Sequence, residues 1–118
     1  MQHVSEAAGA LGVLHISVGI LVIAVAVPFL LGRVPMNRWF GTRLPASYAS
    51  EANWYSMNRY GALQLVWYGA ALIVLGIAAL LVPPRLAGVW FVAMLAAPAV
   101  LAVPMLVMVL RFAKRLPK

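Results

Sequence analysis

The residues best able to do chemistry gather in one polar segment, residues 33–59. Arginines recur there beside Glu51, one of only two acidic residues in the chain. Guanidinium groups bind phosphate or carboxylate through paired hydrogen bonds, so the segment could hold an anionic group. A single acid and the lack of a metal-ligand cluster argue against hydrolysis, and we expect no catalytic residues, no metal and no cofactor.

Two further polar features stand in apolar surroundings. His15, expected a turn or two from the outer end of its helix, could be a ligand or a proton acceptor. Because one histidine makes no metal site, a hydrogen bond to a neighbouring helix is the simpler interpretation. Tyr60, Gln64 and Tyr68 are spaced four residues apart and share a helix face. They either line a cleft that meets the polar segment or hydrogen-bond to another helix, and we favour the second.

The composition indicates which kind of protein must position these groups. The chain has 118 residues, of which 65% are hydrophobic and 9% are charged, whereas a soluble domain is about half apolar and a quarter charged. This excludes an ordinary soluble domain and a disordered tail. The net charge of +7 falls between apolar blocks, so we expect anionic lipid headgroups as partners and no nucleic acid.

Three stretches without charge, residues 7–32, 60–84 and 86–110, exceed the roughly 18 residues that indicate a transmembrane helix. We therefore predict an all-α membrane protein, a single domain over residues 1–118, with spans at about 10–31, 60–82 and 86–110. Glycines in the first two spans keep close to one face and predict close helix packing, which we expect within the chain, with a dimer seam as the alternative: Gly12, Gly19, Gly61, Gly69 and Gly76.

The distribution of lysine and arginine predicts the orientation of the spans. Residues 33–59 and the C-terminal tail hold four cations each, and three spans place both segments on one side of the membrane. The other side holds only Arg85. The positive-inside rule therefore places the N-terminus outside and both the loop and the C-terminus in the cytoplasm.

The connection between the first two spans is longer than a simple link requires. Its second half favours a helix that begins after Ser50, a plausible N-cap, with Glu51 at the positive helix end. No proline follows until Pro83, so the second helix could run about 32 residues and begin outside the bilayer. We expect Arg43 to pair with Glu51 or with carbonyls near Asn58.

Part of this loop resembles the SdpI family of small bacterial membrane proteins. The family pattern is an asparagine, then Gly-x-Arg-x-Pro, then a tryptophan and an asparagine before the next span, and the loop matches it in order, with Leu44 where a threonine is common. The candidate binding motif therefore comprises Asn37, Arg38, Gly41, Arg43, Pro45, Glu51, Trp54 and Asn58.

The resemblance implies an immunity-type role in the bacterial cytoplasmic (inner) membrane. The partner would be a hydrophobic, membrane-active toxic peptide, and some members of the family capture a regulator as sensors. Two alternatives stay open: a small accessory subunit of a larger membrane complex, and a lipid-handling protein that binds phosphate headgroups through Arg38, Arg43 and Arg59. The sequence does not choose between a homo-oligomer and a larger assembly.

Overall fold

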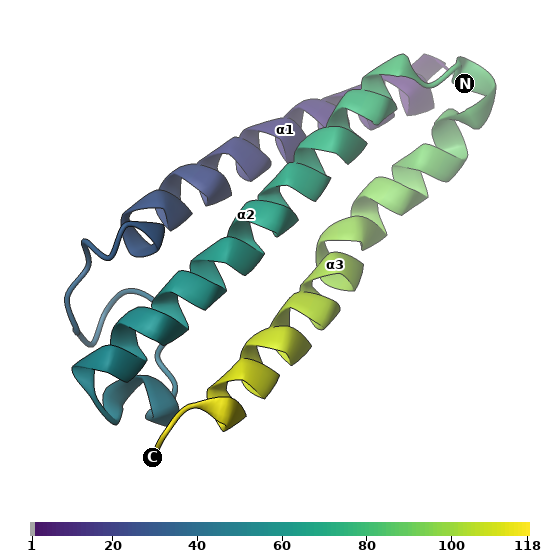
Figure 1. The fold of residues 1–118 in the computed structure, drawn as a ribbon. Coiled ribbons are helices and arrows are strands. Elements are labelled where there is room, and N and C mark those ends of the chain that lie inside the picture. Colours follow the sequence, from purple (N-terminus) through teal and green to yellow (C-terminus); the bar gives the residue numbers. More distant parts are fainter. Residues whose placement is uncertain (1) are drawn as a thin grey trace.

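The computed structural model describes residues 2–118 as three long helices (Figure 1). These are α1 (Gln2–Leu30), α2 (Glu51–Leu81) and α3 (Ala87–Arg115); two short 3₁₀ helices, η1 (Pro45–Tyr48) and η2 (Pro84–Leu86), precede α2 and α3. No strand occurs in the described residues. Three helical segments, the third including η2, are long and apolar enough to cross a membrane, which confirms the predicted all-α fold with three spans.

The helix ends differ from the predicted spans at two places. α1 begins at Gln2 instead of about residue 10, and α3 continues to Arg115, because polar residues extend both helices beyond their apolar cores. α2 begins at Glu51 as predicted, and the Ser50 side chain accepts a hydrogen bond from the Asn53 backbone N–H at 3.0 Å. This N-cap satisfies a donor that the first turn leaves free.

α1 and α2 pack closely because glycines face each other across their interface. A Cβ atom added to Gly19 would lie 2.5 Å from the Gly69 carbonyl oxygen, and one added to Gly76 would lie 2.5 Å from the Gly12 carbonyl oxygen. Since real Cβ atoms do not approach oxygen that closely, only glycine permits this separation. The seven-residue spacing within each helix keeps the contacts on one seam, so the predicted close approach is confirmed for these four glycines, whereas Gly61 lies against the Thr42 side chain of the loop.

α3 is less enclosed than the other two helices. Its buried residues are Ala87 and Met94, close to the tight turn after α2, whereas α2 has buried residues along its whole length. Pro98 and Pro104 lie inside α3, and each lacks the N–H that a regular helix uses for its internal hydrogen bond. The fold is therefore a tight α1–α2 pair with α3 packed more openly alongside.

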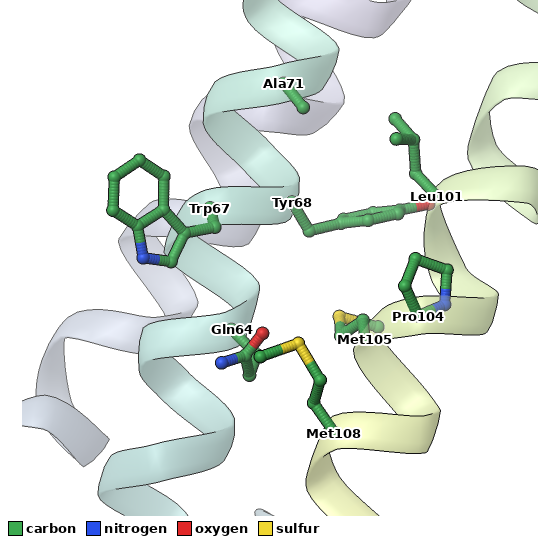
Figure 2. Close-up of a pocket in the computed structure, with 8 residues that line it drawn as sticks. All are labelled: Gln64, Trp67, Tyr68, Ala71, Leu101, Pro104, Met105 and Met108. Carbon is green, nitrogen blue, oxygen red and sulfur yellow. The ribbon is translucent and has the colours of Figure 1, made fainter.

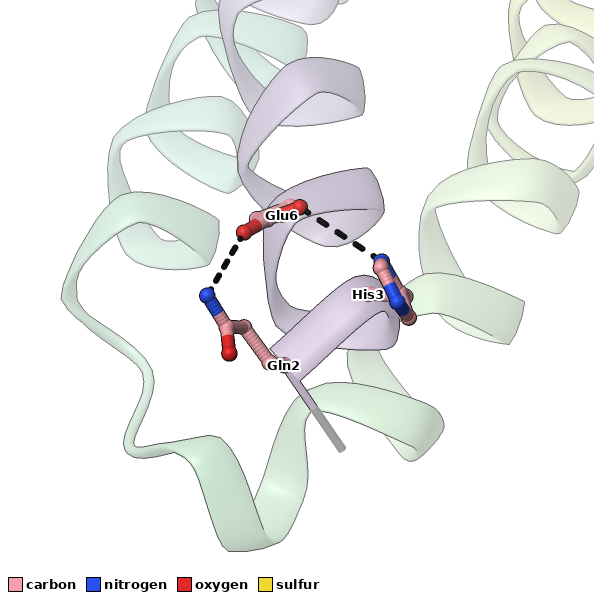
Figure 3. Close-up of polar contacts among 3 residues, drawn as sticks. All are labelled: Gln2, His3 and Glu6. Carbon is pink, nitrogen blue, oxygen red and sulfur yellow. Dashed lines mark hydrogen bonds and ion pairs between the residues drawn. The ribbon is translucent and has the colours of Figure 1, made fainter.

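The two ends of the bundle hold different connections and different chain termini. The α1–α2 loop (residues 31–50) and the C-terminus lie at one end, and the N-terminus and the α2–α3 turn lie at the other (Figure 1). At the N-terminal end, Glu6 accepts a hydrogen bond from Gln2 at 3.2 Å and lies 3.8 Å from the His3 ring, an ion pair when His3 is protonated (Figure 3).

Candidate functional site

The α1–α2 loop is folded, and Asn37 makes its first turn. The Asn37 Oδ1 atom accepts the backbone N–H groups of Trp39 and Phe40, at 2.9 and 2.7 Å. Its amide nitrogen donates to the Pro35 carbonyl at 2.8 Å, and its own carbonyl accepts the Tyr48 hydroxyl. Asparagine suits this position because its short amide can hydrogen-bond neighbouring backbone groups in place of secondary structure.

A second junction joins the middle of the loop to α2 through Asn58. This buried side chain accepts the Thr42 backbone N–H at 2.6 Å and donates to the Trp54 carbonyl at 2.9 Å. Gly41 lies against it with φ of +103°, and a Cβ atom there would collide with the Asn58 oxygen and with Phe29. Glycine is thus needed at residue 41 for its backbone angle and for the space.

Trp54 closes the loop over the start of α2. Its indole is fully buried, donates to the Val34 carbonyl at 2.9 Å and lies 5.6 Å from the Tyr48 ring, centroid to centroid. Asn53 extends the junction to the C-terminal tail, since its amide nitrogen donates to the carbonyls of Ala46 and Pro117 at 3.0 and 2.6 Å. Loop, α2 and tail therefore form one polar-bonded unit.

Two charged residues of the motif do not form the contact expected of them. The Arg43 guanidinium donates to the Arg38 carbonyl at 2.5 Å, within the loop itself. No ion pair to Glu51 and no hydrogen bond to carbonyls near Asn58 occurs among residues 2–118. The expected pairing is wrong, because the nearer Arg38 carbonyl takes the Arg43 hydrogen bond and Glu51 is exposed in the first turn of α2.

The tip of the loop presents aromatic side chains outward. Trp39 is 77% exposed and Phe40 is 68% exposed, between the exposed residues Arg38 and Arg43. The fold holds the backbone under these side chains through Asn37. The motif therefore contains two groups: cations that remain on the surface of the loop, and residues that build the loop, namely Asn37, Gly41, Trp54 and Asn58. Pro45 is the first residue of η1.

The polar stripe on α2 faces α3, and the groove beside it contains no residue of the α1–α2 loop. The Tyr68 hydroxyl donates to the Pro98 carbonyl at 3.0 Å, and the Tyr60 ring stacks on Phe112 with centroids 4.1 Å apart. Gln64, between them, lines an open groove of about 190 Å³ between α2 and α3 (Figure 2). The other lining residues are Trp67, Tyr68, Ala71, Leu101, Pro104, Met105 and Met108.

The loop and this groove lie in the part of the chain that matches a known family. The model of the SdpI/YfhL protein family matches residues 33–109, more than half of the chain. The chain belongs to the SdpI/YfhL family. No curated protein and no solved structure matches it. The match covers residues 33–50 of the loop, all of α2 and most of α3. The α2–α3 groove of this SdpI/YfhL member therefore lies within the family region, and the protein is a multi-pass membrane protein.

Sequence reasoning missed two polar residues, Ser47 and Asn53, that hold the loop of this SdpI/YfhL member together. The buried Ser47 hydroxyl donates to the Thr42 carbonyl at 2.7 Å and accepts the Leu44 N–H at 3.2 Å. Asn53 joins the loop to the tail. Ser47 follows a proline and Asn53 stands three residues after an N-cap, yet the sequence carries no signal for partners as distant as Pro117.

His15 lies deeper in the bundle than the sequence predicted. Because α1 already begins at Gln2, His15 stands close to the middle of that helix. Its Nδ1 atom lies 2.7 Å from the Leu11 carbonyl oxygen of its own helix. The expected hydrogen bond to a neighbouring helix is absent among the described residues, and the buried Nε2 atom has no partner there.

Proposed function

We propose that this SdpI/YfhL-family protein is an immunity-type binding protein of the bacterial inner membrane. It would bind a hydrophobic, membrane-active peptide within the bilayer and so protect the cell that makes it. The role is binding and not catalysis. Membership of the family supports the proposal, and the open groove between α2 and α3 is the observation that carries it.

The groove offers what a peptide in hydrocarbon needs. Apolar surface gains nothing by leaving lipid for protein, so association depends on packing and on polar pairs. Met105 and Met108 supply flexible side chains that adapt to an irregular surface. The Gln64 side chain makes no hydrogen bond among the described residues, and its amide provides a donor and an acceptor for a polar group of the peptide.

Survival of a sensitive bacterium tests the proposal. Cells expressing the protein are challenged with a panel of membrane-active hydrophobic peptides. Ala71→Phe places a ring in the groove, whereas Val74→Phe adds the same ring to an exposed position on the same helix. We expect wild type and Val74→Phe to raise survival. At equal protein levels in the membrane, Ala71→Phe should give survival at least tenfold lower than that of wild type.

Two results would count against binding in the groove. Survival equal to that of cells without the protein, for every peptide of the panel, contradicts an immunity role. Equal protection by Ala71→Phe and Val74→Phe keeps the role but moves the binding surface elsewhere on the bundle.

A sensing role is the second candidate, because the loop tip is suited to capture a regulator. Tryptophan and arginine dominate the energetic centres of protein interfaces, and Trp39 and Arg38 are both exposed on a folded loop. Trp39→Ala should abolish cross-linking of a regulator to a cysteine introduced at Phe40, with survival against the peptide unchanged. Cross-linking that persists in this variant would exclude the tip as the capture surface.

A further inference from the structure

His15 is a buried imidazole halfway along the bundle that the proposed immunity role does not use. It is 5% exposed and lines a pocket of about 110 Å³ where the three helices meet. The pocket is formed by Leu14, His15 and Val18 of α1, Tyr68 and Leu72 of α2, and Pro98 of α3. Leu14 and Val18 are 54% and 38% exposed, so the pocket opens on the lipid-facing surface.

The hydrogen bond of His15 fixes which ring nitrogen carries the proton. The Leu11 carbonyl can only accept, so the Nδ1 atom 2.7 Å away must be the donor. In the neutral ring Nε2 is then an acceptor with a free lone pair. Because the two nitrogens of an imidazole point in widely different directions, Nε2 is turned away from Leu11 and the backbone of its own helix.

The walls of the pocket provide no donor for this lone pair. Tyr68 is the one other side chain in the lining that can donate a hydrogen bond, and its hydroxyl already donates to the Pro98 carbonyl at 3.0 Å. The remaining lining side chains are apolar. No atom of the described residues hydrogen-bonds to Nε2. A buried acceptor without a donor destabilises the folded protein, and a ligand with a hydroxyl donor would remove this penalty.

We propose that this pocket binds a lipid-soluble hydroxyl compound that enters from the bilayer and donates its O–H to His15 Nε2. The apolar walls select an uncharged body, and the lone pair selects a donor. A cavity of about 150 Å³ accommodates benzene, so a pocket of about 110 Å³ takes the hydroxyl end of an alcohol or phenol while its tail stays in lipid. The inference does not depend on the proposed immunity function.

Nitrogen NMR of the intact protein in bilayer nanodiscs tests this site directly. The chain has two histidines, so ¹⁵N-histidine labelling of a His3→Gln variant leaves the signals of His15 alone. The probe is 4-pentylphenol, and pentylbenzene, which lacks the hydroxyl, is its matched control. We expect the unprotonated Nε2 resonance to shift upfield and saturate with 4-pentylphenol and to stay in place with pentylbenzene.

Variants at the mouth of the pocket locate the effect. Val18→Phe narrows the opening and should raise the half-saturating concentration at least tenfold, whereas Ile20→Phe, an exposed residue of the same helix outside the lining, should not change it. Leu14→Phe narrows the same opening and replaces Val18→Phe if that variant loses its helical circular dichroism.

Four results would overturn the proposal. The first two are an Nε2 resonance that 4-pentylphenol leaves unchanged and a shift of equal size with pentylbenzene. The third is an equal half-saturating concentration in the mouth variants and in Ile20→Phe. The fourth is an Nε2 chemical shift that already indicates a hydrogen bond before any probe is added.

Discussion

At the scale of single residues, the Asn58 amide is one of three α2 side chains, with Asn53 and Trp54, that hold the loop on α2. Asn58 uses its oxygen for the Thr42 N–H and its nitrogen for the Trp54 carbonyl, so both of its functional groups are paired in a buried position. The Asn37 turn fixes the backbone of exposed tip residues such as Trp39, and the Asn58 junction fixes the loop that carries this turn on α2. Any role of the tip in recognition therefore depends on Asn58, although Asn58 itself would not contact the partner.

Asn58→Ala should loosen the loop. It removes the acceptor of a part-buried N–H, which costs about 1–3 kcal/mol. We expect trypsin to cleave after Arg38 and Arg43 several-fold faster in this variant in detergent. Ser56→Ala, at an exposed position two residues earlier, is the control. Equal cleavage of Asn58→Ala and wild type would show that the junction does not restrain the loop.

Gly41→Ala should damage the same junction through the backbone. The residue has φ of +103°, and an added Cβ would meet the Asn58 oxygen. A non-glycine residue in such a conformation costs about 1–3 kcal/mol. The midpoint of thermal unfolding should therefore fall in Gly41→Ala, as followed by circular dichroism at 222 nm. A midpoint equal to that of wild type would mean that the loop rearranges at little cost.

The sequence identified several of these residues, but it did not reveal what they contact. Asn37, Gly41, Trp54 and Asn58 were named from the family pattern, which records spacing and not partners. Arg43 was expected to meet Glu51 because opposite charges attract, yet the nearer Arg38 carbonyl takes its hydrogen bond. Partners sixteen or more residues apart depend on where the chain turns, and that is decided by the whole loop.

At the scale of helices, the glycine seam sets the distance between α1 and α2. The sequence predicted the seam because a seven-residue spacing of glycines is visible along each helix. It did not predict that Gly12 meets Gly76 and that Gly19 meets Gly69. That register depends on the length and shape of the folded loop, which no local pattern specifies.

Gly19→Ala tests the seam against a matched control. Its Cβ would lie 2.5 Å from the Gly69 carbonyl oxygen, a backbone atom that cannot move without separating the helices. Overpacking of this kind costs about 1–3 kcal/mol, so the unfolding midpoint should fall. Gly88→Ala makes the same substitution in α3, where a Cβ meets nothing within 4 Å, and should keep or raise the midpoint. Equal midpoints for the two variants would refute the seam.

At the scale of the whole molecule, charge is concentrated at one end of a bundle 55 Å long. Since a hydrocarbon core is about 30 Å thick, the bundle is longer than the core that it would cross. The end with the loop and the C-terminus carries all basic residues but Arg85, as the sequence predicted, and they are exposed there: Arg33, Arg38, Arg43, Arg59, Arg111, Lys114, Arg115 and Lys118. The number of helices and the placement of charge follow from the positions of apolar and basic residues along the chain, so the sequence alone predicted both.

The shared position of the loop and the C-terminus makes the predicted orientation testable with cysteines. The chain has none, so single cysteines at Gln2, Phe40 and Lys118, all exposed, can be compared. By the positive-inside rule, a membrane-impermeant maleimide should label Gln2→Cys on intact cells, and label Phe40→Cys and Lys118→Cys only after lysis. The two loop-end cysteines must agree, because Asn53 joins the loop to Pro117 beside the C-terminus. Labelling of both on intact cells would reverse the orientation, place the aromatic tip outside, and exclude capture of a cytoplasmic regulator.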